Sequence, residues 1–303
     1  MALRRALLPL AVAALACCLA LVAADAQAAY PGKNGRFVFE ANGGIYTVRH
    51  DGSKLKRIAA ASTAKGYIYA GPAWSPSGDR IAYNRDESLQ YRSDIFTMEP
   101  NGTDRTRVTN VPGNFSLLDP SWSPDGQQLV VTGGDYDGAD PDQLYTLDRD
   151  GSALTQITNA PVDSISPAWS PKGNRILLTH GRFGSGSAHL RTISPTGTQP
   201  QILTYVTETV FRTDWAPGGG WIAYAENGAV YKIRADGTDK TRLAGRKFGA
   251  TDVAWSPNGK RIAFDSAQGQ RSGIYKMRRN GSKKKQVLSS KRLSIVNPDW
   301  QSR

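Results

Sequence analysis

The sequence predicts an all-β protein built from six copies of one four-stranded unit, and three observations support this prediction. A tryptophan recurs from Trp74 to Trp300 at steps of 48, 47, 46, 40 and 45 residues. A second mark recurs in step with it, running from Asp51-Gly52 to Asn280-Gly281. The 303 residues include 31 Gly and 17 Pro, so turns are frequent. Four short strands repeated with this period are typical of a β-propeller blade.

Each unit divides into elements with recognisable turn chemistry. The tryptophan strand is followed by Ser-Pro-x-Gly or a close variant, as in 122–126, which places Pro and Gly correctly for a type I turn. A β-branched or aromatic segment such as 80–83 then predicts a half-buried strand, and 95–98 predicts a third. The Asp-Gly or Asn-Gly pair predicts a two-residue hairpin turn with both residues at positive φ, before an edge strand such as 106–109.

The two ends of the chain complement each other. Residues 34–39 match the turn and second strand of a unit, with no tryptophan strand between them and residue 29, whereas residues 297–301 match a tryptophan strand with nothing after it. We therefore expect residues 297–301 to join the N-terminal blade and close a six-bladed ring of four-stranded antiparallel blades, which leaves no open sheet edge. The tryptophans are interpreted as packing residues between blades.

The first 28 residues predict a secretory signal. Arg4 and Arg5 precede an uncharged apolar run over 6–24, and the small residues Ala26 and Ala28 supply a cleavage pattern. We expect cleavage near Ala28, a single propeller domain over 30–303, and a periplasmic or extracellular location. An uncleaved membrane anchor and lipidation at Cys17 are the alternatives. Both cysteines of the chain lie in this segment, so no disulfide is expected after cleavage.

Over residues 31–301 the repeats resemble those of TolB-like proteins, which share the pattern of Trp-Ser-Pro-Asp-Gly, an aromatic strand, a second alternating strand and Asp-Gly-Ser/Thr. The resemblance implies a six-bladed propeller in the periplasm or outside the cell that acts as a protein-interaction scaffold, with a protein or peptide partner in the cell envelope. TolB itself carries a further domain before its propeller, whereas here the repeats begin directly after the predicted signal.

The sequence shows no catalytic constellation, so we expect neither an enzyme nor a cofactor. A Gly-x-Ser-x-Gly elbow is missing, and 184–187 lacks its spacing. The three histidines, His50, His180 and His189, have no ligand-like spacing, and we interpret them as solvated loop or strand-end residues. Two alternatives stay open: a metal-dependent hydrolase of lactones or phosphoesters that uses the propeller channel, and a carbohydrate- or cell-wall-binding propeller.

One loop is a weak calcium candidate. It offers four carboxylates within eight residues, from Asp135, Asp137, Asp140 and Asp142, and carboxylate oxygens suit calcium. The segment is not an EF-hand, because Thr146 stands where the bidentate Glu would be. Asp and Gly also simply favour turns.

Loop lengths predict which face binds a partner. Turns alternate between the two faces of a ring of up-and-down blades, so the short turns share one face and the long, variable loops share the other. Function usually resides on such loops. We expect a peptide or protein segment to dock at the mouth of the channel on the long-loop face. The candidate contacts are Asp119, Arg212, Asp214, Asp252 and Asn297. The alternative is that these side chains cap strand ends and meet only water.

The formal net charge of +12 is unevenly distributed. Residues 119–158 carry eight Asp against one Arg, whereas residues 252–288 carry nine Lys or Arg against two Asp. The predicted basic rim consists of Arg271, Lys276, Arg278, Arg279, Lys283, Lys284 and Lys285. An anionic envelope surface or an acidic partner would suit this rim, and a solvated face is the alternative. We expect a monomer, and no nucleic-acid partner because the export signal separates the two.

Overall fold

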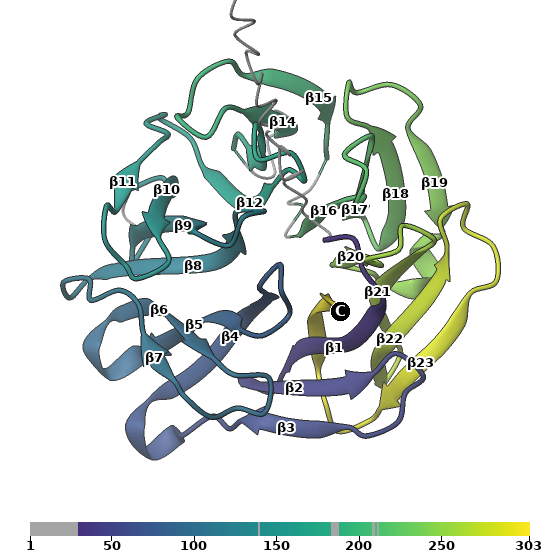
Figure 1. Ribbon diagram of the computed structural model, residues 1–303, viewed down its shortest axis with the longest axis horizontal. Helices are drawn as coiled ribbons and strands as arrows, with labels where there is room; N and C mark the ends of the chain where they lie inside the picture. Colours follow the sequence, from purple (N-terminus) through teal and green to yellow (C-terminus); the bar gives the residue numbers. More distant parts are fainter. Residues whose placement is uncertain (1–29, 139, 183–187, 208–209, 211) are drawn as a thin grey trace, which may run out of the picture.

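The computed structural model describes residues 30–303 except 139, 183–187, 208, 209 and 211. The predicted signal over 1–28 lies outside the described residues. The chain forms an all-β propeller of antiparallel sheets arranged around a central axis (Figure 1). The helical elements of the described part are three short 3-10 turns, η1 (Thr63–Lys65), η2 (Ser88–Gln90) and η3 (Arg246–Phe248), and none of its helices could span a membrane.

Four of the sheets have four strands each. From the axis outward they are β24 (Ile295–Ser302), β1 (Asn34–Ala41), β2 (Gly44–Arg49) and β3 (Lys56–Ala59); β12 (Ser164–Trp169), β13 (Ile176–His180), β14 (His189–Ile193) and β15 (Gln201–Tyr205); β16 (Thr213–Trp215), β17 (Trp221–Glu226), β18 (Ala229–Arg234) and β19 (Thr241–Ala244); β20 (Val253–Trp255), β21 (Arg261–Gln268), β22 (Arg271–Arg278) and β23 (Lys285–Ser290).

The fifth sheet has eight strands and consists of two meanders. They are β4 (Tyr67–Trp74), β5 (Ile81–Glu87), β6 (Arg92–Met98) and β7 (Thr106–Arg107), followed by β8 (Phe115–Trp122), β9 (Gln128–Asp135), β10 (Gln143–Asp148) and β11 (Thr155–Gln156). The two meanders are joined by one parallel bridge, between Ser93 of β6 and Ser116 of β8. Every other strand pairing within this sheet is antiparallel.

The C-terminal strand pairs with the N-terminal sheet, as expected. β24 runs antiparallel to β1, with Phe37 opposite Trp300 and Val38 opposite Asp299. The rings of Phe37 and Trp300 lie 4.5 Å apart between centroids and are fully or nearly fully buried. The two ends of the propeller are therefore held by one sheet.

The Asp-Gly turns differ from the prediction in their geometry. Gly52 has a φ of 93°, but Asp51 does not have a positive φ, and Lys54 three residues later does. The Asp51 carboxylate instead accepts a hydrogen bond from the Ser53 N–H at 2.9 Å, which is an Asx turn. The same bond recurs at Asn101, Asp150, Asp236 and Asn280. A carboxylate or amide at this position closes a longer loop through its own side chain, which explains why Asp and Asn recur there.

Proline interrupts four of the inner strands at the same place. In β4, β8, β12 and β24 the residue third from the tryptophan precedes a proline and has a positive φ, 58° at Gly71, 51° at Asp119, 56° at Ser166 and 53° at Asn297. The strand register shifts at each of these points. Proline lacks the N–H that the ladder needs and is tolerated at bulges, which re-aim neighbouring side chains. β16 and β20 lack this proline and begin after the equivalent position.

The tryptophans pack between neighbouring sheets, as predicted. Trp122 is 5 % exposed and packs against Ala73, Ala82 and Ile95 of the preceding meander. Trp255, 3 % exposed, packs in the same way beside Ala216 and Ala223. Each aromatic anchors the sheet that follows in the chain to the one before it.

Candidate functional site

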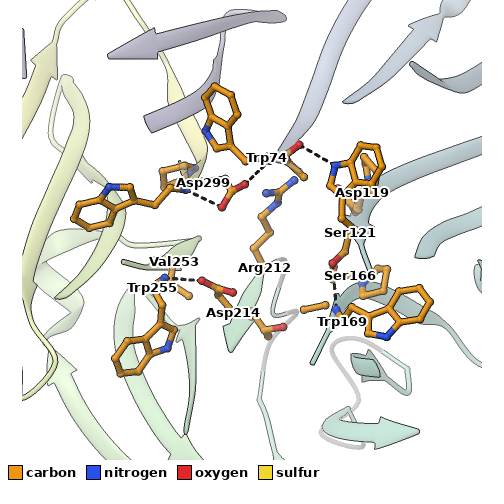
Figure 2. A pocket seen from close by; sticks show the side chains of 18 of the residues that line it. Trp74, Asp119, Ser121, Ser166, Trp169, Arg212, Asp214, Val253, Trp255 and Asp299 are labelled. Atoms are coloured by element: carbon orange, nitrogen blue, oxygen red, sulfur yellow. Dashed lines mark hydrogen bonds between the residues drawn. The ribbon is translucent and has the colours of Figure 1, made fainter. Parts of the chain in front are cut away.

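The inner strands enclose a small cavity of about 80 Å³ at the axis (Figure 2). Three of the predicted mouth residues, Asp119, Arg212 and Asp214, line it. A volume of this size holds a few water molecules, each of which occupies about 30 Å³ in the liquid. It is too small for a sugar ring or a peptide, so a larger ligand would contact the mouth of the channel.

The tier nearest the long loops is formed by the third residue before each tryptophan. Arg212 donates to the Pro72 carbonyl oxygen at 3.2 Å. Its charge lowers the pKa of the carboxyls of Asp119 and Asp252, but burial outweighs this effect and both pKa values are raised. The Asn297 N–H donates to Asp252 Oδ2 at 3.2 Å, and the Asn297 amide donates to Glu40 Oε2 at 3.1 Å. Burial also raises the pKa of Glu40. This tier holds more carboxyls than cations.

The next tier is formed by the residue directly before each tryptophan. The Trp74 N–H donates to Asp299 Oδ2 at 2.6 Å, and the Trp255 N–H donates to Asp214 Oδ2 at 2.5 Å. These bonds join adjacent sheets across the axis side, as Figure 2 shows. Burial, reinforced by the Asp299 charge, raises the pKa of Asp214 well above its ordinary value. The two carboxyls are thus held by backbone donors and are part of the scaffold.

The contact between sheets alternates around the ring. Where the residue before the tryptophan is Ala73 or Ala168, its carbonyl oxygen accepts from the indole of the next tryptophan, Trp122 or Trp215, at 3.3 and 3.1 Å. Where that residue is Ser121, its Oγ accepts from the Trp169 backbone N–H at 3.1 Å. A polar side chain therefore appears in the channel only where the backbone donor of the next sheet needs an acceptor.

Tyr30 lies against the cavity from the short-turn side. Its hydroxyl donates to the Trp122 carbonyl oxygen at 3.1 Å. Burial and the nearby charges of Asp299 and Asp214 raise the pKa of this phenol well above 10. The N-terminal end of the described chain therefore fills that end of the channel.

The structure brings all five predicted mouth residues into one neighbourhood. Asp119, Arg212 and Asp214 line the cavity, while Asp252 and Asn297 are hydrogen-bonded to each other beside it. The sequence analysis missed Asp299, Glu40 and Tyr30. Asp299 occupies the same place in its repeat as Asp214, directly before a tryptophan, and this signal could have found it. Glu40 carries no such mark, because its strand lacks a tryptophan.

The predicted calcium loop does not form a ligand cage. Within the described residues, no three His, Cys, Asp or Glu side chains lie close enough to hold a metal ion. The Asp142 N–H donates to Asp163 Oδ1 at 3.1 Å, and burial, with Asp163 next, raises the pKa of Asp142. Asp135, Asp137 and Asp140 lie on the exposed turn between β9 and β10, although residue 139 is outside the described part.

A serine and a histidine form a pair that sequence analysis did not predict. The Ser164 hydroxyl and His180 Nδ1 lie 2.9 Å apart. His180 is at a strand end, as expected, but it is buried, and burial together with the Arg191 charge lowers its pKa to about 4. Ser164 is completely buried, so no substrate can reach its hydroxyl. The pair is a core hydrogen bond and not a catalytic dyad.

The structure divides the predicted basic rim. Arg271 begins β22 on the long-loop side, whereas Arg278 ends that strand about 23 Å away, since a strand rises about 3.3 Å per residue. Lys276 and Lys285 face each other across β22 and β23. Arg279, Lys283 and Lys284 lie in the turn between these two strands. All but Lys276 are exposed.

Known proteins with similar sequences and structures share this architecture. Tol-Pal system protein TolB of Hahella chejuensis is 28% identical over 234 residues, which cover 75% of this chain and 48% of that protein. The chain thus spans about half the length of this curated relative. The crystal structure of TolB from Acinetobacter baumannii matches with a TM-score of 0.74 and 19% identity, over 89% of this chain and 67% of that one.

A chain of a Nidogen/Laminin complex shows how widely the fold itself occurs. It matches with a TM-score of 0.70 at 11% identity, over 88% of this chain and 98% of that one. Likeness at such low identity shows the fold alone. The model of the TolB beta propeller domain matches residues 40–230, which is more than half of the sequence. The chain therefore belongs to the TolB beta propeller domain family.

Proposed function

We propose that this chain is an exported, non-catalytic six-bladed propeller that binds a protein or peptide segment of the cell envelope at the channel mouth on its long-loop face. The pairing of the strands supports the count of six. The eight-stranded sheet consists of two four-stranded meanders joined by one bridge, so each meander corresponds to one blade. The signal pattern over 1–28 and the family membership support export to the envelope.

The observation that carries this proposal is the backbone conformation at the mouth. Asp119, Ser166 and Asn297 all have positive φ, a conformation that costs about 1 kcal/mol or more for a residue with a side chain. Gly71 occupies the same place in its own unit and adopts the conformation freely. Three of four such positions keep a polar side chain where glycine would relieve strain. Strained polar residues that cluster at one opening are typical of binding sites.

The charge of the mouth indicates what part of a partner it would receive. Asp252 is 3 % exposed, and its Oδ1 has no hydrogen-bond partner among the described residues. A buried carboxylate oxygen without a donor is costly, and a Lys or Arg side chain of a partner would supply that donor. Glu40 and Asp119, whose pKa values are raised by burial, would gain from the same cation. We therefore expect the bound segment to insert a basic side chain.

Photo-crosslinking at two leucines tests the proposed face. Leu89, 70 % exposed in η2, lies on the long-loop side, and Leu154, 41 % exposed, follows a short Asp-Gly turn on the opposite side. A benzophenone amino acid at Leu89 should capture an envelope component, and the same group at Leu154 should not. The Asp119→Asn/Asp252→Asn pair, which keeps the shapes of both side chains, should reduce the yield of the Leu89 adduct at least tenfold. Equal adducts from both positions, or an adduct that survives both substitutions, would overturn the proposal.

Export is tested separately. The mature protein recovered from the producing cell should begin close to Ala29, as read by N-terminal sequencing of the envelope and secreted fractions. A chain that retains Met1 and stays in the cytoplasmic fraction would contradict export without bearing on the mouth.

A further inference from the structure

The short-turn end of the last sheet carries a groove lined by cations. Its lining residues come from two neighbouring turns and the strand ends beside them: Asn258, Gly259, Lys260, Arg261, Arg278, Arg279 and Asn280. The groove is open to solvent and has a volume of about 840 Å³. It contains four cationic side chains and no carboxylate. It lies on the face opposite the proposed mouth and concerns a second surface of the molecule.

Strand register places like charges directly opposite each other along this groove. Arg261 of β21 faces Arg278 of β22, and Lys276 of β22 faces Lys285 of β23. Like charges at opposed positions destabilise a sheet. Because side chains alternate along a strand, these four cations share one face of the sheet. They form two tiers that are two residues, or about 7 Å, apart.

The cations of this sheet have no acidic counterparts to neutralise them. Ion pairs within 4 Å in the described part of the chain involve cations from Arg80 to Lys240, and none from 252–303. Burial, with the nearby Arg261 and Lys285, lowers the pKa of Lys276, whose Nζ donates to the His50 carbonyl oxygen at 2.5 Å. Burial and the Arg279 charge lower the pKa of Lys232 on the neighbouring sheet. The crowding of positive charge is therefore felt by the protein's own lysines.

We propose that this groove binds a linear phosphate-bearing polymer that lacks nucleobases. Arginine side chains bind phosphate oxygens in pairs of hydrogen bonds, and the two tiers would contact successive phosphate groups of one chain. The lining contains no aromatic side chain on which a base could stack, which argues against single-stranded nucleic acid. The exposed large apolar side chains of the described residues all precede residue 206, so this end offers none to insert into a bilayer.

Binding of inorganic polyphosphate to the mature protein tests the inference. Titration should show saturable binding at 50 mM salt, and about four phosphate contacts predict that a fourfold rise in salt weakens binding roughly 50-fold to 150-fold. The Arg261→Gln/Arg278→Gln variant should bind at least tenfold more weakly. Its matched control is Arg175→Gln/Arg234→Gln, which removes the same two charges from other sheets, and this control should bind within about twofold of the parent. Thermal unfolding verifies that both variants are folded.

Each other result would overturn the proposal. Equal losses in the two double variants would mean that overall net charge, and not the groove, attracts the polymer. Competition by inorganic phosphate at the same total phosphate concentration would indicate a site for a single ion. Vesicles of phosphatidylglycerol that bind while polyphosphate does not would identify a lipid surface as the ligand. A parent protein that binds none of these probes would leave the cations as a solubility feature, against the inference.

Discussion

The units spanning 119–158 and 252–288 lie on opposite sides of the ring and have opposite charges (Figure 1). The first carries a net charge of −7 and the second +7. Both nevertheless fold into the same four-stranded meander with the same short turns. The fold therefore does not require either charge pattern, and the difference has to be explained by what each unit meets outside itself.

One pair of matched positions shows how the two units treat charge. At the first position of the second strand, Gln128 faces Asp148 and donates to its Oδ1 at 3.1 Å. The equivalent pair in the last unit is Arg261 opposite Arg278. The acidic unit completes its hydrogen bond internally, whereas the basic unit keeps two cations that repel. Unrelieved repulsion is the physical signature by which a binding surface differs from a merely charged one.

The tryptophans of the two units differ in the same position-by-position way. The Trp122 indole donates to Ala73, whereas Trp255 receives its link through its backbone N–H to Asp214, and its indole has no partner among the described residues. Both rings are nearly fully buried. Packing is thus equivalent in the two units, and only the hydrogen bond distinguishes them.

Substitution of these tryptophans has the largest expected effect. Trp122→Ala and Trp255→Ala should each lower the free energy of unfolding by about 3–5 kcal/mol, because each removes a buried ring from between two sheets. Trp→Phe then separates packing from hydrogen bonding. Trp122→Phe leaves the Ala73 carbonyl unpaired and should cost about 1 kcal/mol more than Trp255→Phe. Urea unfolding measures all four. Equal costs for the two Phe variants would mean that the indole bond contributes nothing.

The pH dependence of stability provides the next contrast. Asp265 accepts hydrogen bonds from the N–H groups of Thr251 and Asp252, both at 2.8 Å, while burial and then the Asp252 charge raise its pKa to about 7. Thr132 occupies the equivalent place in the acidic unit and accepts from the Ser166 N–H. A folded-state pKa above the unfolded value of 3.8 means that the stabilising contribution is complete below about pH 4. It is lost as the pH rises toward 7.

The matched variants at this position are Asp265→Asn and Thr132→Val. Asp265→Asn cannot ionise, so it should remove a decline of about 2–4 kcal/mol in unfolding free energy between pH 4 and pH 7. Thr132→Val should cost about 1 kcal/mol at every pH, because it removes an acceptor and no charge. Chemical unfolding across this pH range measures both. A pH profile for Asp265→Asn that is as steep as the parent's would assign the decline to the channel carboxyls.

Sequence periodicity predicted more of the scaffold than of the site, for a physical reason. Turn residues and buried aromatics act locally, so Trp122 and the Pro124-Asp125-Gly126 turn were readable from their own neighbourhoods. Asp299 could also be found, because it repeats the position of Asp214. Glu40 could not, because its pairing with Asn297 depends on ring closure between residues 257 positions apart. The groove was missed in part for the same reason. Lys260 and Arg261 join Arg278 only through strand register.

The smallest expected effect comes from exchanging the charge pattern of the two units at their matched pair. Arg278→Glu places a carboxylate opposite Arg261 and should raise the free energy of unfolding by about 0.2–1 kcal/mol relative to Arg278→Gln, since an opposed ion pair replaces a lone cation. The difference should shrink at 1 M salt, where charges are screened within about 3 Å. The reverse exchange, Gln128→Arg/Asp148→Arg, should destabilise the acidic unit by a similar amount.

Chemical unfolding at low and high salt measures these variants, and polyphosphate titration of the same proteins completes the test. If Arg278→Glu gains stability and loses binding together, the repulsion at this pair is retained for a ligand. A variant that gains stability while it still binds polyphosphate like the parent would show that the repulsion has no such use. The acidic unit, which already has its pair satisfied, should gain no polyphosphate binding from a single cation at Gln128, because one isolated charge cannot contact successive phosphates.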